Sequence, residues 1–274
     1  MNTWHNDFVN TNGIRLHYHR TGGDKPVLVM LHGITDNGLC WSRAAQVLAA
    51  DYDCLLVDAR GHGLSDKPED GYTSDDYAAD VAGLIEGLGL GPVLLMGHSL
   101  GAITAAAVAA NYPHLVAGAV LEDPPWRDQS EAQAQMSPEQ AVAWMANWRA
   151  NLVTEQKLSA EEIIAAERKR SPAWHADEFP DWAQAKLQVN PDVLGPNRLR
   201  AWDDLTPKLV CPALLVTGDP TLGAIVTPGL ASKICTANPK VVHTHIPNTG
   251  HSIRRENFDA FLAAVRPFLA ELHK

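Results

Sequence analysis

Short apolar runs alternate with longer helical stretches along this chain, and the alternation predicts a sheet whose strands are joined by helices. Eight runs have the length and composition of strands, namely residues 8–11, 14–19, 27–31, 54–57, 93–96, 118–121, 213–217 and 241–246. Asn12-Gly13 separates the first two and is typical of a two-residue hairpin turn. The later runs are continuously apolar, as expected for parallel strands buried on both faces.

Helical patterns fill most of the intervals between the later strands. They cover residues 41–50, 74–88, 100–111 and 256–272. Strands that alternate with helices after an N-terminal hairpin are typical of the α/β class. We therefore expect a doubly wound, mostly parallel eight-stranded sheet.

Residues 124–207 break this rhythm because they contain no convincing strand. Three or four helices are predicted there, at residues 138–153, 160–169, 181–189 and 197–202. Ser137-Pro138 and Ser159 with Glu162 mark two of their starts. An all-helical insertion between two strands predicts a cap. The expected organisation is a core over residues 1–125, a cap over 126–206 and the rest of the core over 207–274.

Composition narrows the function classes. The 274 residues suffice for one large α/β domain, and a formal net charge of -10 argues against a nucleic-acid partner. No apolar run approaches the ~20 residues that span a bilayer, and the N-terminus lacks the pattern of a signal peptide. Four scattered cysteines without a C-x-x-C pair predict neither a disulfide nor a metal site. We expect a cytoplasmic protein without a membrane partner.

Gly97 to Gly101 read G-H-S-L-G and carry the strongest chemical signal. This stretch follows the apolar run 93–96 and opens onto the alanine-rich residues 102–110. A strand, G-x-S-x-G and a helix in this order are typical of a nucleophile elbow, in which the serine occupies a strained turn. We expect Ser99 to be a nucleophile, which requires a nearby base and an electropositive pocket for the developing oxyanion.

Three further segments complete a family resemblance. His32-Gly33-Ile34-Thr35 follows a strand, residues 58–65 read D-A-R-G-H-G-L-S, and Gly250-His251-Ser252 lies near the C-terminus. With the serine motif, they make the sequence resemble the α/β-hydrolase superfamily, as a serine carboxylesterase-like member with a helical cap. The resemblance implies an α/β-hydrolase fold and catalysis without a cofactor or metal. It also implies that His251 is the base and that the oxyanion hole consists of the Ile34 and Leu100 backbone amides.

Two carboxylates compete for the role of the acid that orients the histidine. Asp219 comes soon after the run 213–217, at the strand end where most relatives carry the acid. Asp123 ends the preceding strand, where some relatives carry it instead. Both lie at the carboxyl end of a strand, so spacing does not separate them. Asp219 is the favoured acid because its location is the commoner one, and Asp123 is the alternative.

Six of the eight tryptophans lie in the predicted cap: Trp126, Trp144, Trp148, Trp174, Trp182 and Trp202. A lid over a catalytic serine faces the site, so we expect several of them to line the substrate pocket, with Trp126, Trp144 and Trp148 as candidates. Aromatic walls suit a bulky, largely apolar substrate.

The expected function is that of a cofactor-free serine hydrolase that cleaves a carboxylic ester through an acyl-enzyme. Its partner would be a small-molecule ester, with a bulky ester or a lactone as candidates, and the oligomeric state stays open. Carbon–carbon bond hydrolases and aminopeptidases of the same fold fit the same residues. A hydrolase-like ligand receptor can retain them as well, and only a turnover assay separates that class. Haloalkane dehalogenases and epoxide hydrolases of this superfamily are disfavoured, because those enzymes need an aspartate where Ser99 stands.

Overall fold

The computed structural model describes residues 4–128, 130, 137–195 and 199–272. Within them, eight strands form one sheet, as predicted, and their order is β1-β2-β4-β3-β5-β6-β7-β8. The strands are β1 (His5–Thr11), β2 (Ile14–Arg20), β3 (Val27–Leu31), β4 (Asp53–Val57), β5 (Val93–His98), β6 (Val116–Glu122), β7 (Ala213–Thr217) and β8 (Val241–His245).

Strand direction follows the predicted pattern. The hairpin β1-β2 is antiparallel and pairs antiparallel with β4, whereas the other neighbouring strands pair in parallel. Asn12 and Gly13 both have positive φ, at 45° and 78°, as a two-residue turn of this kind requires. The carboxyl ends of the parallel strands consequently meet at one edge of the sheet.

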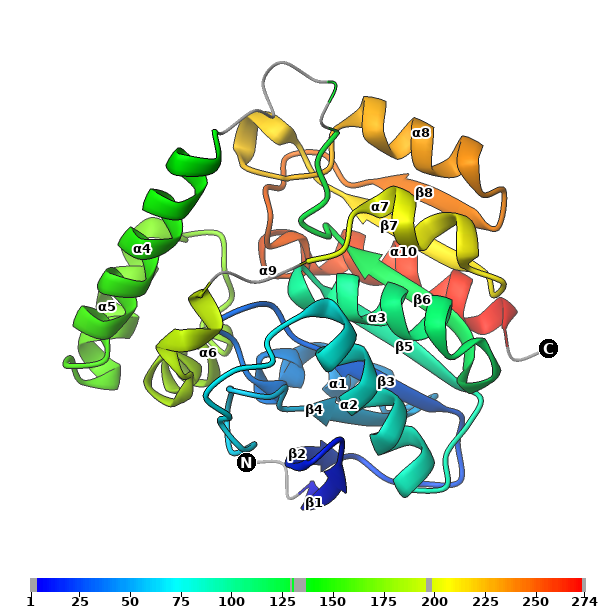
Figure 1. The fold of residues 1–274 in the computed structure, drawn as a ribbon, viewed down its shortest axis with the longest axis horizontal. Helices are drawn as coiled ribbons and strands as arrows, with labels where there is room; N and C mark the ends of the chain where they lie inside the picture. The colour runs from blue at the N-terminus through cyan, green and yellow to red at the C-terminus, as the bar shows by residue number, and fades with distance from the viewer. Residues whose placement is uncertain (1–3, 129, 131–136, 196–198, 273–274) are drawn as a thin grey trace.

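Helices cover both faces of this sheet (Figure 1). On one face α2 (Ser74–Gly87), α3 (Leu100–Asn111) and α8 (Pro228–Ala237) pack against the strands. On the other face lie α1 (Ser42–Leu48) and α10 (Phe258–Glu271). Within β3, Val29 belongs to the first core and Met30 to the second, which shows that the strand is buried on both sides. The sequence did not predict α8, although Thr227-Pro228 is a typical helix start.

Between β6 and β7 the described residues contain helices and no strand. The three longer ones, α4 (Pro138–Glu155), α5 (Ala160–Arg170) and α6 (Glu178–Gln188), gather beside the sheet (Figure 1). Ser137 and Ser159 form the capping boxes of α4 and α5. Of the fourth expected helix, residues 197 and 198 lie outside the described residues, and the short α7 (Trp202–Leu205) begins at its predicted last residue.

Two further expectations concern cysteines and membranes. All four cysteines are free in the structure. Among the helices of the described residues, none is both long and apolar enough to cross a membrane.

Candidate active site

Ser99 occupies a sharp turn between β5 and α3. Its φ is 53°, in the left-handed region that non-glycine residues rarely adopt. The two flanking glycines allow this turn: a Cβ on Gly97 would collide with the Gly101 carbonyl, and a Cβ on Gly101 with the Leu31 carbonyl. The close contact of β5, α3 and β3 therefore holds Ser99 at the edge of the sheet. There the serine lines a cavity of about 680 Å³.

His251 lies on the loop between β8 and the short helix α9 (Ile253–Glu256) and lines the same cavity. Its Nδ1 is 2.7 Å from Oδ2 of Asp123, which is fully buried at the end of β6. The same carboxylate accepts the backbone N–H groups of Ile225 and Val226, at 2.8 and 3.0 Å. An ionised carboxylate only accepts hydrogen bonds, so His251 donates through Nδ1 and keeps Nε2 available as a base.

Asp219, the favoured acid, does not contact His251. Its Oδ1 lies 3.0 Å from Nε2 of His245, and its Oδ2 accepts the Asn248 N–H at 2.6 Å. The Asp219 N–H also donates to the Thr249 carbonyl at 2.6 Å, which directs this side chain toward β8. The preference for Asp219 is therefore corrected in favour of the alternative, Asp123.

Ser99 and His251 line the same cavity, and no hydrogen bond joins them. Among the described residues, Ser99 Oγ has no hydrogen-bond partner. Such bonds are often long in unliganded enzymes and shorten when substrate binds. The His251 loop is held by Glu256, whose carboxylate accepts the Gly250 N–H at 2.5 Å and the Ser252 N–H at 3.2 Å. Sequence reasoning missed Glu256, because a lone glutamate in a short helix carries no motif.

The two expected oxyanion donors, at Ile34 and Leu100, belong to residues that line the same cavity as Ser99. Leu100 is the first residue of α3, where backbone N–H groups have no acceptor within the helix. Ile34 follows β3 and also lines the cavity. His32 orders this loop: its Nδ1 donates to the Gly33 carbonyl at 2.8 Å and its Nε2 accepts the Ala59 N–H at 3.0 Å. Burial lowers the pKa of His32, which keeps the ring neutral and able to accept.

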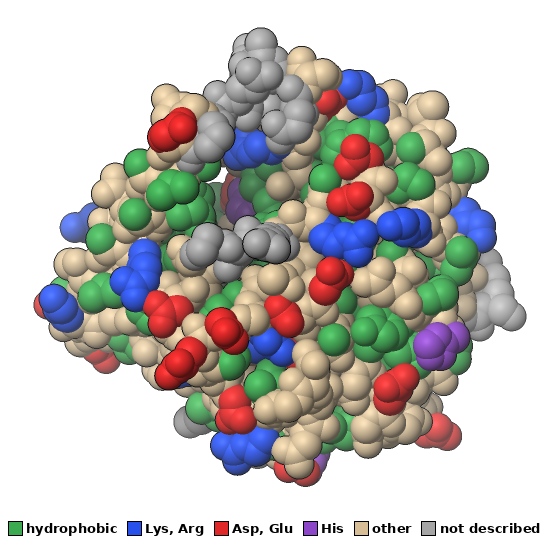
Figure 2. Space-filling model, viewed as in Figure 1, with side chains coloured by type: hydrophobic (Ala, Val, Ile, Leu, Met, Phe, Trp, Pro, Cys, Tyr) green, Lys and Arg blue, Asp and Glu red, His purple; other side chains and the backbone are tan. Residues whose placement is uncertain are grey.

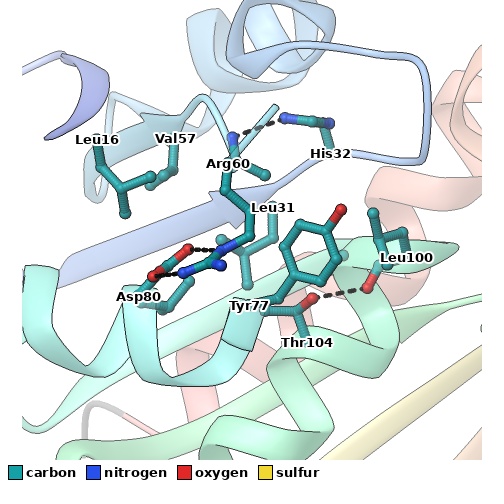
Figure 3. Close-up of a pocket in the computed structure, with 12 residues that line it drawn as sticks. Leu16, Leu31, His32, Val57, Arg60, Tyr77, Asp80, Leu100 and Thr104 are labelled. Carbon is teal, nitrogen blue, oxygen red and sulfur yellow. Dashed lines mark hydrogen bonds and ion pairs between the residues drawn. The ribbon is translucent and has the colours of Figure 1, made fainter. Parts of the chain in front are cut away.

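A second, much smaller cavity has Leu100 among its lining residues (Figure 3). Its volume is about 20 Å³, which is room for a water molecule and not for a substrate. Arg60 and Asp80 both line it and form an ion pair, with Arg60 Nε and a terminal nitrogen each 2.6 Å from the carboxylate. This pair neutralises two buried charges, and the cavity is not a candidate site.

The segment between β6 and β7 contributes aromatic walls to the large cavity. Trp144 and Trp148 line it, as predicted, with their ring centroids 5.0 Å apart. Trp174 and Trp182 line it too. Figure 2 shows a hollow between the cap side of the molecule and the core, with histidine visible inside.

Trp126 does not join the other candidate tryptophans. It is 2% exposed, packs into the hydrophobic core and is not among the cavity-lining residues that the structure describes. The chain turns tightly after β6, with the Trp126 N–H donating to the Pro124 carbonyl at 2.7 Å. This turn directs the indole into the core, which corrects its assignment to the substrate pocket.

Comparisons with known proteins agree with this fold. Residues 28–264 match the model of the alpha/beta hydrolase family. A segment of 104 residues is 46% identical to 2-(acetamidomethylene)succinate hydrolase of Mesorhizobium japonicum, covering 38% of this chain and 37% of that protein. The chain thus matches little more than a third of that relative's length.

Two other relatives match over nearly the whole chain. N-formylmaleamate deformylase of Pseudomonas putida is 29% identical over 95% of both chains. The solved structure of a thermophilic esterase from Thermogutta terrifontis, with malate bound, superimposes with a TM-score of 0.75. It is 26% identical and the match covers 98% of this chain and 100% of the esterase.

Proposed function

The chain belongs to the alpha/beta hydrolase family, and on this premise we propose that it is a cofactor-free serine hydrolase that cleaves a carboxylic ester through an acyl-enzyme. The observation that carries the proposal is the 2.7 Å contact between His251 and the buried Asp123, in the cavity that Ser99 also lines. A nucleophile, a base and an orienting acid are the parts that acyl transfer to serine needs. The esterase of similar structure supports an ester as the substrate.

The proposed mechanism has two halves. Ser99 Oγ attacks the ester carbonyl carbon while His251 Nε2 takes the hydroxyl proton, and the Ile34 and Leu100 N–H groups stabilise the oxyanion. The intermediate then expels the alcohol, which receives the proton from His251. In the second half His251 removes a proton from water, the water oxygen attacks the acyl carbon, and Ser99 leaves with that proton. Asp123 stabilises the imidazolium in both halves.

A second candidate bond is the C–N bond of a small carboxylate-bearing amide. Two of the relatives carry names of this kind, a hydrolase of an acetamidomethylene succinate and a deformylase of N-formylmaleamate. Arg127 is exposed and lines the cavity, and within the described residues it has no ion-pair partner, so its charge is available to a carboxylate. The same serine and histidine would serve, with His251 protonating the leaving nitrogen.

Substrate panels separate the two candidates. We would measure kcat/KM for p-nitrophenyl esters of rising acyl length, for natural esters and lactones, and for N-formylmaleamate. A natural ester or lactone with the highest kcat/KM supports the first candidate. A clear preference for the amide, lost in Arg127→Ala, would replace it by the second. Absence of turnover on every substrate, with folded protein, would favour a receptor.

Trp144→Ala or Trp148→Ala is expected to change the ranking of ester substrates. These side chains form one wall of the cavity, so shortening either should shift the kcat/KM ratio of long to short esters by about 10-fold. The control is Val142→Ala, because Val142 lies on the same helix, is 69% exposed and is not among the described residues that line the cavity. An equal loss on all esters that follows the melting temperature would show that these tryptophans serve stability alone.

Exhaustive chelation is expected to leave activity unchanged. In the proposed reaction, Ser99, His251 and two backbone amides supply the nucleophile, the base and the donors to the oxyanion, and no step uses a metal ion. The measurement compares ester turnover before and after dialysis against EDTA. A loss that added zinc reverses would contradict the metal-free mechanism.

A further inference from the structure

The cap reaches the oxyanion loop, defined as Gly33 to Asn37, through a buried lysine of α6. Lys186 is 6% exposed, and its Nζ donates to the carbonyl and the hydroxyl of Thr35, both at 2.8 Å. A third contact, to Asp36 Oδ1, is 3.3 Å long. An ammonium group has three N–H donors, so these contacts use all of them. Lys186 therefore acts on the loop and is not free to bind a substrate carboxylate.

The Thr35 carbonyl shares a peptide unit with the Asp36 N–H, and this N–H connects it to the peptide unit of the expected oxyanion donor. In a trans peptide the C=O and N–H groups point in opposite directions. The N–H of the Thr35–Asp36 peptide donates to the Gly33 carbonyl at 3.0 Å. That carbonyl belongs to the peptide unit that carries the Ile34 N–H. Two peptide units thus connect the lysine ammonium to the expected oxyanion donor.

The loop conformation needs this support. Thr35 has a φ of 67°, in the left-handed region that a β-branched residue rarely adopts unless its surroundings hold it there. His32 holds the Gly33 carbonyl from the core, and Lys186 holds the Thr35 carbonyl from the cap. A cation at the head of a hydrogen-bonded chain also polarises the donors further along it.

Charge balance keeps the lysine in place. Asp36 is 3% exposed and lies 3.1 Å from Arg255 as well as 3.3 Å from Lys186. Burial alone would raise the pKa of Asp36, but Arg255, Lys186 and Arg254 together hold it well below its usual range. Arg255 also pairs with Glu178 on α6, at 3.4 Å. Ion pairs therefore bind α6 to the loop and to the segment after His251.

We propose that Lys186 is a positioning residue that orients the Ile34 N–H of the oxyanion hole through the Thr35–Asp36 and Gly33–Ile34 peptide units. The packing of helix α6 against the oxyanion loop and the orientation of the Ile34 N–H then depend on the same lysine. The inference rests on the proposed function, because an oxyanion hole matters only in acyl transfer.

Lys186→Met tests the inference. Losing a whole oxyanion donor costs about 10²- to 10³-fold in kcat, so its misorientation should lower kcat on p-nitrophenyl acetate by about 10- to 100-fold with little change in KM. Trifluoroacetophenone, whose serine hemiketal places an oxyanion in the hole, should bind more weakly by the same factor. Gln188→Met is the matched control. It removes the 2.9 Å hydrogen bond that the Asn37 side chain donates to Gln188, and this bond involves neither of the two peptide units. Its kcat should therefore stay near that of the wild type.

Lys186→Arg covers the case in which Lys186→Met does not fold. It keeps a cation beside Asp36, but a planar guanidinium cannot place its donors on the same three acceptors, so kcat and ketone affinity should still fall together. A folded Met or Arg variant with wild-type kcat and ketone affinity would overturn the inference. An equal loss in Gln188→Met would do the same, since anchoring of the cap would then explain both. Wild-type protein that neither hydrolyses the ester nor binds the ketone in a Ser99-dependent way would instead remove the proposed function itself.

Discussion

Ser99→Ala is expected to lower kcat for an ester by about 10⁵- to 10⁶-fold while the protein stays folded. The hydroxyl supplies the nucleophile, and the Ile34 and Leu100 N–H groups cannot replace it. They and substrate binding should leave a residual rate of about 10³- to 10⁴-fold over water. The measurement is ester turnover at saturating substrate, together with the melting temperature.

A serine outside the cavity provides the control for this substitution. Ser232 is exposed on α8, so Ser232→Ala should keep wild-type turnover. Wild-type turnover in Ser99→Ala would contradict the assignment of the nucleophile. A folded but inactive Ser232→Ala would show that the assay reports something other than this site.

Asp123→Asn is expected to cost up to ~10⁴-fold in kcat, because an amide in place of the carboxylate favours the wrong tautomer of His251. Asp219→Asn should stay close to wild type in kcat, since Asp219 contacts His245 and Asn248 and not His251. The two variants change the same chemical group at the ends of neighbouring strands, so each is the control for the other. Both are measured for turnover and for melting temperature.

The opposite result would restore the sequence-based preference. A nearly normal Asp123→Asn beside an inactive, folded Asp219→Asn would mean that the His251 loop rearranges during catalysis to meet Asp219. The asparagine oxygen at position 123 can still accept one of the Ile225 and Val226 amides, which now bond the carboxylate. A large fall in melting temperature would therefore reflect the loss of these amide bonds, whereas the fall in kcat reflects the histidine.

Local sequence patterns predicted the fold and the elbow well, because both depend on neighbours in the chain. Alternating apolar runs predict the strands, and Gly97 and Gly101 predict the tight turn at Ser99. The acid could not be predicted, because two carboxylates end neighbouring strands. What separates them is loop geometry: Asp123 has a φ of 38°, and its carboxylate binds amides from a loop about a hundred residues away.

Contacts between the core and the cap were out of reach for the same reason. Lys186 lies 151 residues from Thr35 in sequence, and a single lysine on an amphipathic helix is usually a solvated charge. Trp126 and Trp144 both belong to the predicted cap, yet one is buried in the core and the other is 51% exposed and lines the cavity. The positions of the tryptophans in the sequence predicted that several lie near the site, but not which of them face it.

The central claim is that Ser99 forms a covalent acyl-enzyme, and trapping that intermediate tests it most directly. Wild-type protein is mixed with p-nitrophenyl acetate, quenched in acid within the first turnover and analysed by mass spectrometry, intact and after digestion. We predict one acetyl group per chain, located on Ser99, absent in Ser99→Ala and longer-lived in Asp123→Asn, where water is activated more slowly. An acetyl group on another residue would contradict the account. So would rapid turnover without any acyl-enzyme in both the wild type and Asp123→Asn.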